Sequence, residues 1–565
     1  MNGNKAARVL NRIFQICFFL CMAVTFISVI VSGYIKGDKD IKDASGKITT
    51  VKVYYGPLAH WLIYISAILM AVLFCVLFYM STRKYRLHSR SEKMPAEKKF
   101  RIILFSMTGV LLLLLLYVGY ELTIYPRTDL LQVHTFASSF AETGNFQGTR
   151  DLIASGENVY MARYPNNFGI MFLLAMYYRV IYLIFGYVPL YAPVVLNCIA
   201  LTSSMLFATL IVKNIWGRRR AVYFLILIFL FAPLYPYTPF FYTDTLSMPF
   251  GIIGIYLYVL GLKADNSQKV KKYALIFFAG AIIFLGFKVK GNLIVVIAAA
   301  VIFALLKCKW KEFGCILLAL VIGFGSFALL FKAGYNAVGL VTEAQADRYE
   351  YPYTHWVMMG LKGKGGYNAK DSIFTGSQTS KAAKQEANIK EIKKRVKTLV
   401  NNHKFTEHFV VKASWMWGDG TYFIPGHIKD YVKRSYLHEV FLRDGKYYYL
   451  FFGYCNAYQL VLLFMMLMSL LKGILRPKIE FSVFLKGIVF ATFVFLLVWE
   501  GRSRYLFNLT PVYIMLAVDG ISFTTESVRK LIQKIRKKPD LTETVSEGSV
   551  DEVIKATAAA EASEK

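Results

Sequence analysis

Long apolar runs separated by short polar stretches dominate the pattern of hydrophobic and polar positions along the chain. Twelve of these runs approach the roughly 17–25 residues that a helix needs to cross a bilayer. They lie at about 9–33, 57–80, 102–120, 191–212, 221–240, 247–262, 273–287, 291–306, 313–332, 451–471, 482–499 and 505–522. The pattern therefore predicts an all-α polytopic membrane protein.

A further apolar run at 166–186 has an ambiguous placement, which the basic residues between the runs resolve. Six basic clusters lie near 83–101, 213–220, 269–272, 307–311, 472–478 and 529–538. If 166–186 crossed the bilayer, each later cluster would move to the outer side, against the positive-inside rule. We therefore expect this run to lie along or re-enter the outer face, where Arg179 and neighbouring tyrosines favour the interface. Both termini and all six clusters are then cytoplasmic.

The spans divide the chain into five parts. Two N-terminal spans with a basic cytoplasmic linker occupy 1–101, a membrane module occupies 102–332, an extracytoplasmic segment occupies 333–450, C-terminal spans occupy 451–522, and a cytoplasmic basic stretch with its tail occupies 523–565. We expect the tail to be disordered from about 540 onward. Apolar residues at helical spacing from Ile389 to Leu399 predict a helix in the outer segment that packs on protein or on anionic headgroups. A solvated basic face on a helix that packs on its own loop is an equally open alternative.

Composition narrows the class of function. The chain has 565 residues, 56% of them hydrophobic, with a mean hydropathy of +0.45 and a formal net charge of +31. Because the basic residues cluster between apolar runs, this charge is topological and indicates no nucleic-acid partner. The cysteines lie in or beside apolar runs, which indicates neither a disulfide framework nor a CxxC metal site. The sequence contains no Walker loop, so it gives no indication of an ATP-driven pump.

Ionisable residues at four outer turns are the strongest functional signal in the sequence. A charged side chain near the hydrocarbon costs about 2.5–3.5 kcal/mol on insertion scales, so its presence there requires a reason. The turns carry Arg127, Asp129 and His134; Tyr242 and Asp244; Lys288 and Lys290; and Glu500, Arg502, Arg504 and Tyr505. We therefore expect carboxylates and cations to converge at one membrane face.

These residue types suit the transfer of a sugar from a lipid phosphate. A phosphate leaving group is a weak base that needs cations rather than a general acid, and the lysines and arginines of these turns would supply them. An acceptor hydroxyl needs a base, for which Asp129 is the first choice and Asp244 the second. The remaining residues of the four turns are candidate substrate contacts. His355, in the aromatic-polar stretch 353–356 of the outer segment, is another.

Simpler roles are open for the same residues. Asp129 and Asp244 could each cap a helix, because aspartate is a favoured N-cap residue. The two lysines could extend to phospholipid headgroups, and the charges of 500–504 could neutralise one another. His134 could be a satisfied interfacial histidine. Tyr242 and Tyr505 could contact the donor, but we favour a place for them in the aromatic belt at the membrane interface.

At these residues the chain resembles the GT-C superfamily of membrane glycosyltransferases, which includes protein O-mannosyltransferases and aminoarabinose transferases. The resemblance covers about 102–522. It consists of a first module span, Asp129 in the next outer loop, the surface run 166–186, Asp244 in the following outer turn, and the stretch Glu500-Gly501-Arg502-Ser503-Arg504-Tyr505. It implies a GT-C-like catalytic module at 102–332. Asp129 is followed by leucine rather than a second carboxylate, so a paired-acid metal site is not supported and we expect no cofactor, although a divalent metal stays open.

The resemblance implies a polyprenyl-phosphate-sugar donor and inverting transfer in a single displacement. The acceptor would be a cell-envelope glycan or lipid on the outer side of a bacterial plasma membrane. Two rival functions stay open. An envelope polysaccharide polymerase or ligase would rely on outer-loop arginines and histidines, whereas a lipid-linked-sugar transporter would place its charges at mid-bilayer.

Overall fold

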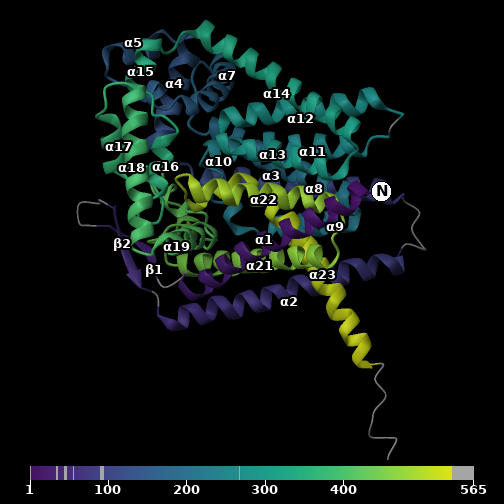
Figure 1. The fold of residues 1–565 in the computed structure, drawn as a ribbon. Helices are drawn as coiled ribbons and strands as arrows, with labels where there is room; N and C mark the ends of the chain where they lie inside the picture. The colour runs from purple at the N-terminus through teal and green to yellow at the C-terminus, as the bar shows by residue number, and fades with distance from the viewer. Residues whose placement is uncertain are drawn as a thin grey trace, which may run out of the picture.

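A bundle of long helices forms the body of the protein (Figure 1). The computed structural model describes residues 2–32, 36–42, 48–54, 56–88, 95–265 and 267–536. The bundle consists of α1 (Asn2–Ser32), α2 (Pro57–His88), α3 (Ala96–Glu121), α8 (Ala192–Trp216), α9 (Arg218–Phe229), α11 (Met248–Lys263), α12 (Lys269–Val289), α13 (Ile294–Lys307), α14 (Trp310–Val338), α21 (Tyr448–Leu475), α22 (Phe481–Val498) and α23 (Thr510–Arg536). These twelve helices correspond to the twelve predicted spans, and the predicted all-helical polytopic fold is confirmed.

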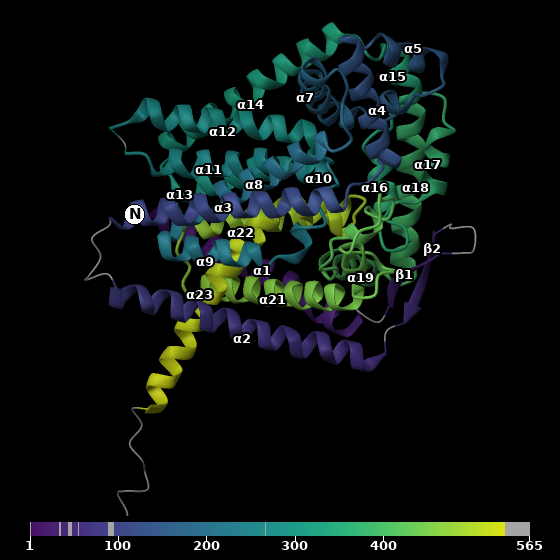
Figure 2. The ribbon, with the colours of Figure 1, turned by 180° about the vertical axis from the view of Figure 1, so that it is seen from behind.

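The connections between these helices collect at the two ends of the bundle. The N-terminus, the C-terminal end of α2 and the links after α8, α11, α13 and α21 lie at one end, here called the basic end (Figure 1). The opposite end, here called the site end, carries the short helices of the two long connections (Figure 2). They are α4 (Thr128–Thr143), α5 (Gln147–Ser155), α6 (Tyr160–Arg163), α7 (Phe168–Phe185), α15 (Glu343–Tyr349), α16 (Thr354–Gly360), α17 (Ala369–Gly376), α18 (Lys381–Asn401), α19 (Phe405–Trp417) and α20 (His438–Phe441).

The structure departs from the predicted elements in three places. Helix α9 ends at Phe229 rather than near 240, because Pro233, Pro236 and Pro239 cannot continue a helix. A β-hairpin of β1 (Lys36–Lys42) and β2 (Ile48–Tyr54), which the sequence did not reveal, connects α1 to α2. Helix α23 extends to Arg536, beyond the predicted end at 522. The tail predicted to be disordered from 540 lies outside the described residues.

Helix α7 contains the ambiguous apolar run at 166–186. By length and composition it qualifies as a membrane span, one of eleven such stretches among the described residues. It is nevertheless seen end-on in both views, whereas the bundle helices lie in the plane of the pictures (Figures 1 and 2). Gly169 allows its close approach to α12, because a Cβ atom there would lie 2.1 Å from the carbonyl oxygen of Lys288. This orientation across the bundle axis favours placement along the surface.

Lys412 of α19 joins the outer segment to the end of α22. Its ammonium group donates hydrogen bonds to the carbonyl oxygens of Gly360 (2.9 Å), Leu497 (2.9 Å) and Trp499 (2.6 Å). The carbonyl groups at a helix C-terminus carry partial negative charge, so they stabilise a cation without a carboxylate. Burial lowers the pKa of Lys412 to about 7, and the nearby Glu500 opposes that shift. Lys412 therefore sets the position of the chain that leaves α22 at the site end.

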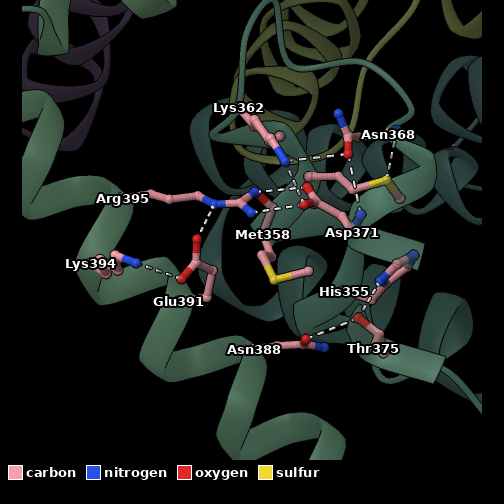
Figure 3. A network of polar contacts seen from close by, with 12 residues as sticks. His355, Met358, Lys362, Asn368, Asp371, Thr375, Asn388, Glu391, Lys394 and Arg395 are labelled. Carbon is pink, nitrogen blue, oxygen red and sulfur yellow. Dashed lines mark hydrogen bonds and ion pairs between the residues drawn. The ribbon is translucent and has the colours of Figure 1, made fainter. Parts of the chain in front are cut away.

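A buried polar network holds three helices of the outer segment together (Figure 3). Arg395 of α18 forms two hydrogen bonds of 2.8 Å with the carboxylate of Asp371 on α17, and it also donates to the carbonyl oxygen of Met358 on α16. Lys362 donates to the same carboxylate at 3.0 Å. Helix α18, predicted from its apolar spacing, thus packs on protein, while its lysines 390, 393, 394 and 397 are exposed.

Replacing Arg395 should loosen this part of the outer segment. In Arg395→Met the Asp371 carboxylate loses its bidentate partner and keeps only Lys362, so we expect a loss of about 3 kcal/mol in local stability. Hydrogen–deuterium exchange of α16, α17 and α18 would measure the faster opening. Lys394→Met, which removes an exposed neighbour on the same helix, is the matched control. Equal exchange in both variants would contradict the structural role of the Asp371 pair.

The lowered pKa of Lys412 predicts a pH dependence of stability. Between pH ~7 and ~10 the unfolded chain retains a proton at Lys412 that the native protein has lost, so stability should rise with pH in this window. The rise of Tm between about pH 7 and pH 9 should therefore be smaller in Lys412→Met than in the unsubstituted protein. Lys433→Met, at an exposed position of the same segment, should keep the original slope. Parallel curves for all three proteins would show that the native pKa of Lys412 is not depressed.

Candidate functional site

The carboxylate of Asp244 is the centre of a charged cluster at the site end. It is fully buried, forms an ion pair with Lys290, and lies 3.8 Å from a guanidinium nitrogen of Arg504. Burial lowers the pKa of Lys290, and the Asp244 carboxylate opposes that shift. Asp244 lies in the first turn of α10 (Thr243–Leu246), whose N-cap is Tyr242 without a side-chain cap, so it does not have the capping role. Three of the four predicted turns thus meet at one carboxylate.

Neighbouring polar and aromatic groups hold the Asp244 turn in place. The proline-containing stretch after α9 includes η2 (Ala232–Leu234), and Asn197 of α8 donates to the carbonyl oxygens of Tyr237 (3.0 Å) and Thr238 (2.8 Å). The ring of Tyr237 stacks on Phe507, with centroids 3.5 Å apart. Phe507 belongs to η5 (Ser503–Leu509), which also carries Arg504. These contacts fix the backbone of the Asp244 turn next to η5, and Asp244 therefore lies close to Arg504.

A similar contact fixes the lysine turn. Asn292 of η3 (Gly291–Leu293) donates to the carbonyl oxygen of Tyr505 at 3.2 Å, and Asn508 donates to Asn292 at 2.9 Å. The Lys290 ammonium lies 5.0 Å from the ring centroid of Tyr505, a cation–π contact. The turn after α12 and the stretch after α22 are thus joined by side chains as well as by charge.

Asp129 lies on the other side of Tyr242 in the same cluster. Burial, together with Tyr242 and Asp129, raises the pKa of the Tyr160 phenol well above its usual value, which places Tyr160 beside both residues. Asn167 of η1 (Pro165–Asn167) links the two tyrosines, donating to Tyr160 at 2.6 Å and accepting from Tyr242 at 3.3 Å. The Arg504 guanidinium lies 5.9 Å from the Tyr242 ring centroid. Tyr242 therefore connects the two predicted catalytic aspartates.

The backbone is strained at Thr128, directly before Asp129, and Asp129 is not the N-cap of its helix. Helix α4 begins at Thr128, its N-cap is Arg127, and no side chain caps it. Thr128 has a φ of 52°, a left-handed conformation that costs a β-branched residue of order 1–3 kcal/mol. An isolated antiparallel bridge between Ile124 and Tyr431 of the outer segment anchors the preceding residues. The strained residue thus directly precedes Asp129, and Tyr422 and Phe423 of the outer segment also have positive φ values of 52° and 62°.

The connector between α22 and α23 supplies Glu500 to the same cluster. Glu500 is 5% exposed and accepts a hydrogen bond of 2.9 Å from the Tyr505 hydroxyl. Burial raises the pKa of Glu500, and Arg504 opposes that shift. Asp419 of the outer segment holds the connector, because its carboxylate accepts from Ser503 at 2.6 Å and from the backbone N–H of Phe423 at 2.9 Å.

The outer segment adds cations and a histidine beside this connector. The Arg502 guanidinium lies 3.5 Å from the ring centroid of Phe423, and Arg443 lies 5.2 Å from the same ring. His427 stacks on Phe240 with centroids 4.3 Å apart. Burial, followed by Arg504, Arg502, Arg443 and Lys429, holds the pKa of His427 well below its usual value. The cluster therefore has a strongly positive side.

Three buried polar atoms in this cluster lack a hydrogen-bond partner within the described part of the chain. They are Oδ2 of Asp244, Nε of Arg502 and Nε2 of His427. Buried polar groups are almost always hydrogen-bonded in native proteins, so an unpaired donor beside an unpaired acceptor calls for an explanation. A polar ligand with both donor and acceptor groups could provide partners for the arginine, the histidine and the carboxylate.

Four predicted site residues lie outside this cluster. Lys288 extends over the ring of Phe331, 4.8 Å from its centroid, and Arg127 is an exposed partner of Asp430 at 3.1 Å. His134 is hydrogen-bonded to Tyr178 at 2.8 Å, and burial lowers its pKa to about 4, as expected of a satisfied histidine. His355 is buried against Thr375 at 2.8 Å, within the outer segment (Figure 3). Their predicted roles in substrate binding stay predictions.

Sequence reasoning missed several residues of the cluster. His427, Arg443 and Asp419 belong to a long polar segment, where a charge carries no insertion cost and therefore gives no signal. Tyr160 lies in a four-residue helix that the sequence pattern did not indicate. Within the described residues, no three His, Cys, Asp or Glu side chains group as metal ligands.

Comparison with known proteins gives one family model and two solved structures of low similarity. No curated protein sequence matches the chain. The archaeal oligosaccharyltransferase AglB from Archaeoglobus fulgidus, in complex with an inhibitory peptide and a dolichol-phosphate, is 11% identical with a TM-score of 0.35 over 77% of this chain and 52% of its own. ArnT from Cupriavidus metallidurans, bound to undecaprenyl phosphate, is 11% identical with a TM-score of 0.30 over 77% of this chain and 81% of its own. The chain thus spans about half the length of the archaeal structure.

The family model that matches the sequence is described as a conserved hypothetical integral membrane protein, and it matches residues 6–524. Since this match covers more than half of the chain and includes every residue of the charged cluster, the chain belongs to that family of integral membrane proteins.

Proposed function

We propose that the protein transfers a monosaccharide from a polyprenyl-phosphate carrier to an acceptor at the outer membrane face. The observation that carries this proposal is the meeting of Asp244, Lys290 and Arg504 in one buried cluster, next to Tyr242, whose phenol also interacts with the half-buried Asp129. A lipid-phosphate donor has an anionic leaving group, which cations stabilise. The acceptor hydroxyl that attacks the sugar needs a carboxylate as its base. The cluster supplies both at the end of the bundle.

The positive side of the cluster suits the phosphate. Arg502, with its unpaired buried Nε, and Arg504 would bind the phosphate oxygens, and Lys290 would add a point charge. Cations fixed in place before the reaction stabilise the charge that grows on the departing phosphate. The Asp244 carboxylate, already paired with Lys290, would hold these cations in position and prevent their mutual repulsion from opening the site.

Asp129 suits the role of general base. Its carboxylate is half-buried beside the phenols of Tyr160 and Tyr242, and it has no cation bound to it among the described ion pairs. In a single inverting displacement the acceptor oxygen forms a bond to the anomeric carbon as the bond from that carbon to the phosphate oxygen breaks. The hydroxyl proton passes to Asp129, and the electron pair of the broken bond leaves on the phosphate.

The distribution of charge supports an extracytoplasmic location for this cluster. The links with the basic clusters lie at the basic end, which the positive-inside rule assigns to the cytoplasm. The site end would then face outward, where a bacterial cell-envelope glycan or lipid is available as the acceptor.

Replacing either aspartate by asparagine should abolish sugar transfer. Asp129→Asn removes the base and should reduce transfer by about 10²-fold or more, and Asp244→Asn should do the same by releasing Lys290 and Arg504. A deletion strain complemented with each variant would be assayed by mass spectrometry of its envelope glycans. The predicted defect is one missing side-branch sugar. Asp151→Asn, at an exposed position of α5, is the control and should restore the wild-type glycan.

The same strains separate the rival functions. Full restoration by both variants would refute the transferase proposal. Shortened or unattached polymers with intact side branches would indicate a polymerase or ligase instead. A reconstituted protein that moves a labelled lipid-linked sugar across vesicles without forming any transfer product would indicate a transporter.

Replacing Arg502 should weaken phosphate binding without the loss of the base. Arg502→Gln removes a charge-assisted hydrogen bond, so affinity for an alkyl phosphate, measured by calorimetry on the purified protein, should fall about tenfold. Asp129→Asn should leave this affinity unchanged, because the base faces the acceptor. A loss of similar size in both variants would contradict the separate roles.

A further inference from the structure

A second charged site lies at the basic end of the bundle, opposite the aspartate cluster. A cavity of about 140 Å³ opens beside the link from α21 to α22, and α1 contributes Gln15 to its wall. One water needs only ~10–15 Å³ by this measure, so a tetrahedral anion fits. The cavity is smaller than the ~300–1,000 Å³ clefts that hold drug-sized ligands, which excludes a nucleotide sugar.

The lining of this cavity is predominantly positive. Lys472, Arg476, Lys478 and Lys486 face it, and Glu480 is the one acidic residue among its lining groups. Lys472 is paired with Asp519 at 2.6 Å, and Arg476 with Glu526 at 3.6 Å. The charges of Lys478 and Lys486 are therefore offset at the cavity by one carboxylate, that of Glu480. The remaining charge favours an anion.

Lys486 makes this a built site rather than a surface patch. It lies in the membrane helix α22 and is 1% exposed, a position where a charge is expensive. Its ammonium donates to Gln15 at 2.8 Å and to the carbonyl oxygen of Ser469 at 2.7 Å. An ammonium group has three donors, so these contacts leave one for a ligand in the cavity. The carboxylate of Asp519 accepts instead from Lys472 and Ser469.

The wall beside Lys486 is also fixed. Gln15 accepts from Lys486 and donates to Asn11 at 3.0 Å, which orients its amide. Gly473 of α21 allows this arrangement, because a Cβ atom there would lie 1.5 Å from the Gln15 side-chain oxygen. The first residues of α22 border the cavity as well, and the free N–H groups at a helix N-terminus favour an anion. Three helices thus hold the donors in position without a ligand.

From this geometry we infer that the cavity binds a phosphate group through Lys486 and Lys478. Phosphate has the charge to balance the excess cations and the oxygens to accept from the lysines and the α22 backbone. It can come from two sources at this boundary, the headgroup of a phosphomonoester lipid or free phosphate. This site is separate from the proposed transfer reaction, since α22 lies between it and the aspartate cluster.

The test uses the full-length protein in the Arg502→Gln background, so that phosphate binding at the aspartate cluster is already weakened. One arm titrates inorganic phosphate at constant ionic strength by calorimetry. The other arm uses native mass spectrometry of protein in phosphatidylcholine nanodiscs with and without phosphatidic acid. Lys486→Met and Lys478→Gln should each reduce binding about tenfold or more. Lys534→Gln, at an exposed position of α23 at the same end, is the matched control and should bind normally.

The two arms distinguish the sources of phosphate. Binding in both arms, or in either one alone, that is lost in the two cavity variants supports the site and names its source. Lys478 is exposed at the rim, so its variant tests the proposal even if Lys486→Met fails to fold. No binding in either arm, or binding that Lys478→Gln leaves intact, would overturn the inference.

Discussion

The site end depends on the buried ion pair between Asp244 and Lys290. A carboxylate without solvent contact must be paired, and removing one partner of such a pair typically costs about 3–5 kcal/mol. The pair can form only if the turn before α11 meets the turn after α12, and Arg504 brings the stretch before α23 to the same point. No disulfide joins the cysteines of the described residues, so charge and packing position these turns.

The outer segment completes this arrangement rather than covering it as a separate domain. Lys412 binds the carbonyl groups at the end of α22, and Asp419 binds Ser503 a few residues later. Both ends of the connector that carries Glu500 and Arg502 are therefore held by one segment. That segment also contributes His427. The division of the chain at 333 and 450 stays a prediction, and the cluster is built across both boundaries.

The cost of charge near a membrane explains which site residues the sequence could reveal. Asp244, Lys290 and Arg504 stand between apolar runs, where each charge is conspicuous, and the structure places them together. The same reasoning also selected Lys288 and Arg127, because the sequence does not tell which way a side chain points from a turn. Lys288 lies only two residues before Lys290, but its ammonium contacts aromatic rings instead of Asp244.

The fold was predictable for a similar reason. The lengths of the apolar runs predicted the helices of the bundle, and the basic clusters predicted that 166–186 is not one of them. Three prolines make α9 shorter than its predicted run. The hairpin before α2 and the contacts of the outer segment depend on tertiary pairing that no local pattern encodes.

The charges inside the spans require a different explanation from those between them. For the lysines and arginines in the links of the basic end, the positive-inside rule predicts a role in orienting the chain, which needs only exposure to solvent. Lys486 and Asp519 are buried within helices and cannot serve that role. Helix α22 begins at the cavity beside Lys486 and ends at the carbonyl groups that Lys412 binds. Helix α22 is continuous, so a shift along its axis at the basic end would move the Glu500 connector at the site end. One helix therefore joins the buried lysine to the proposed active site.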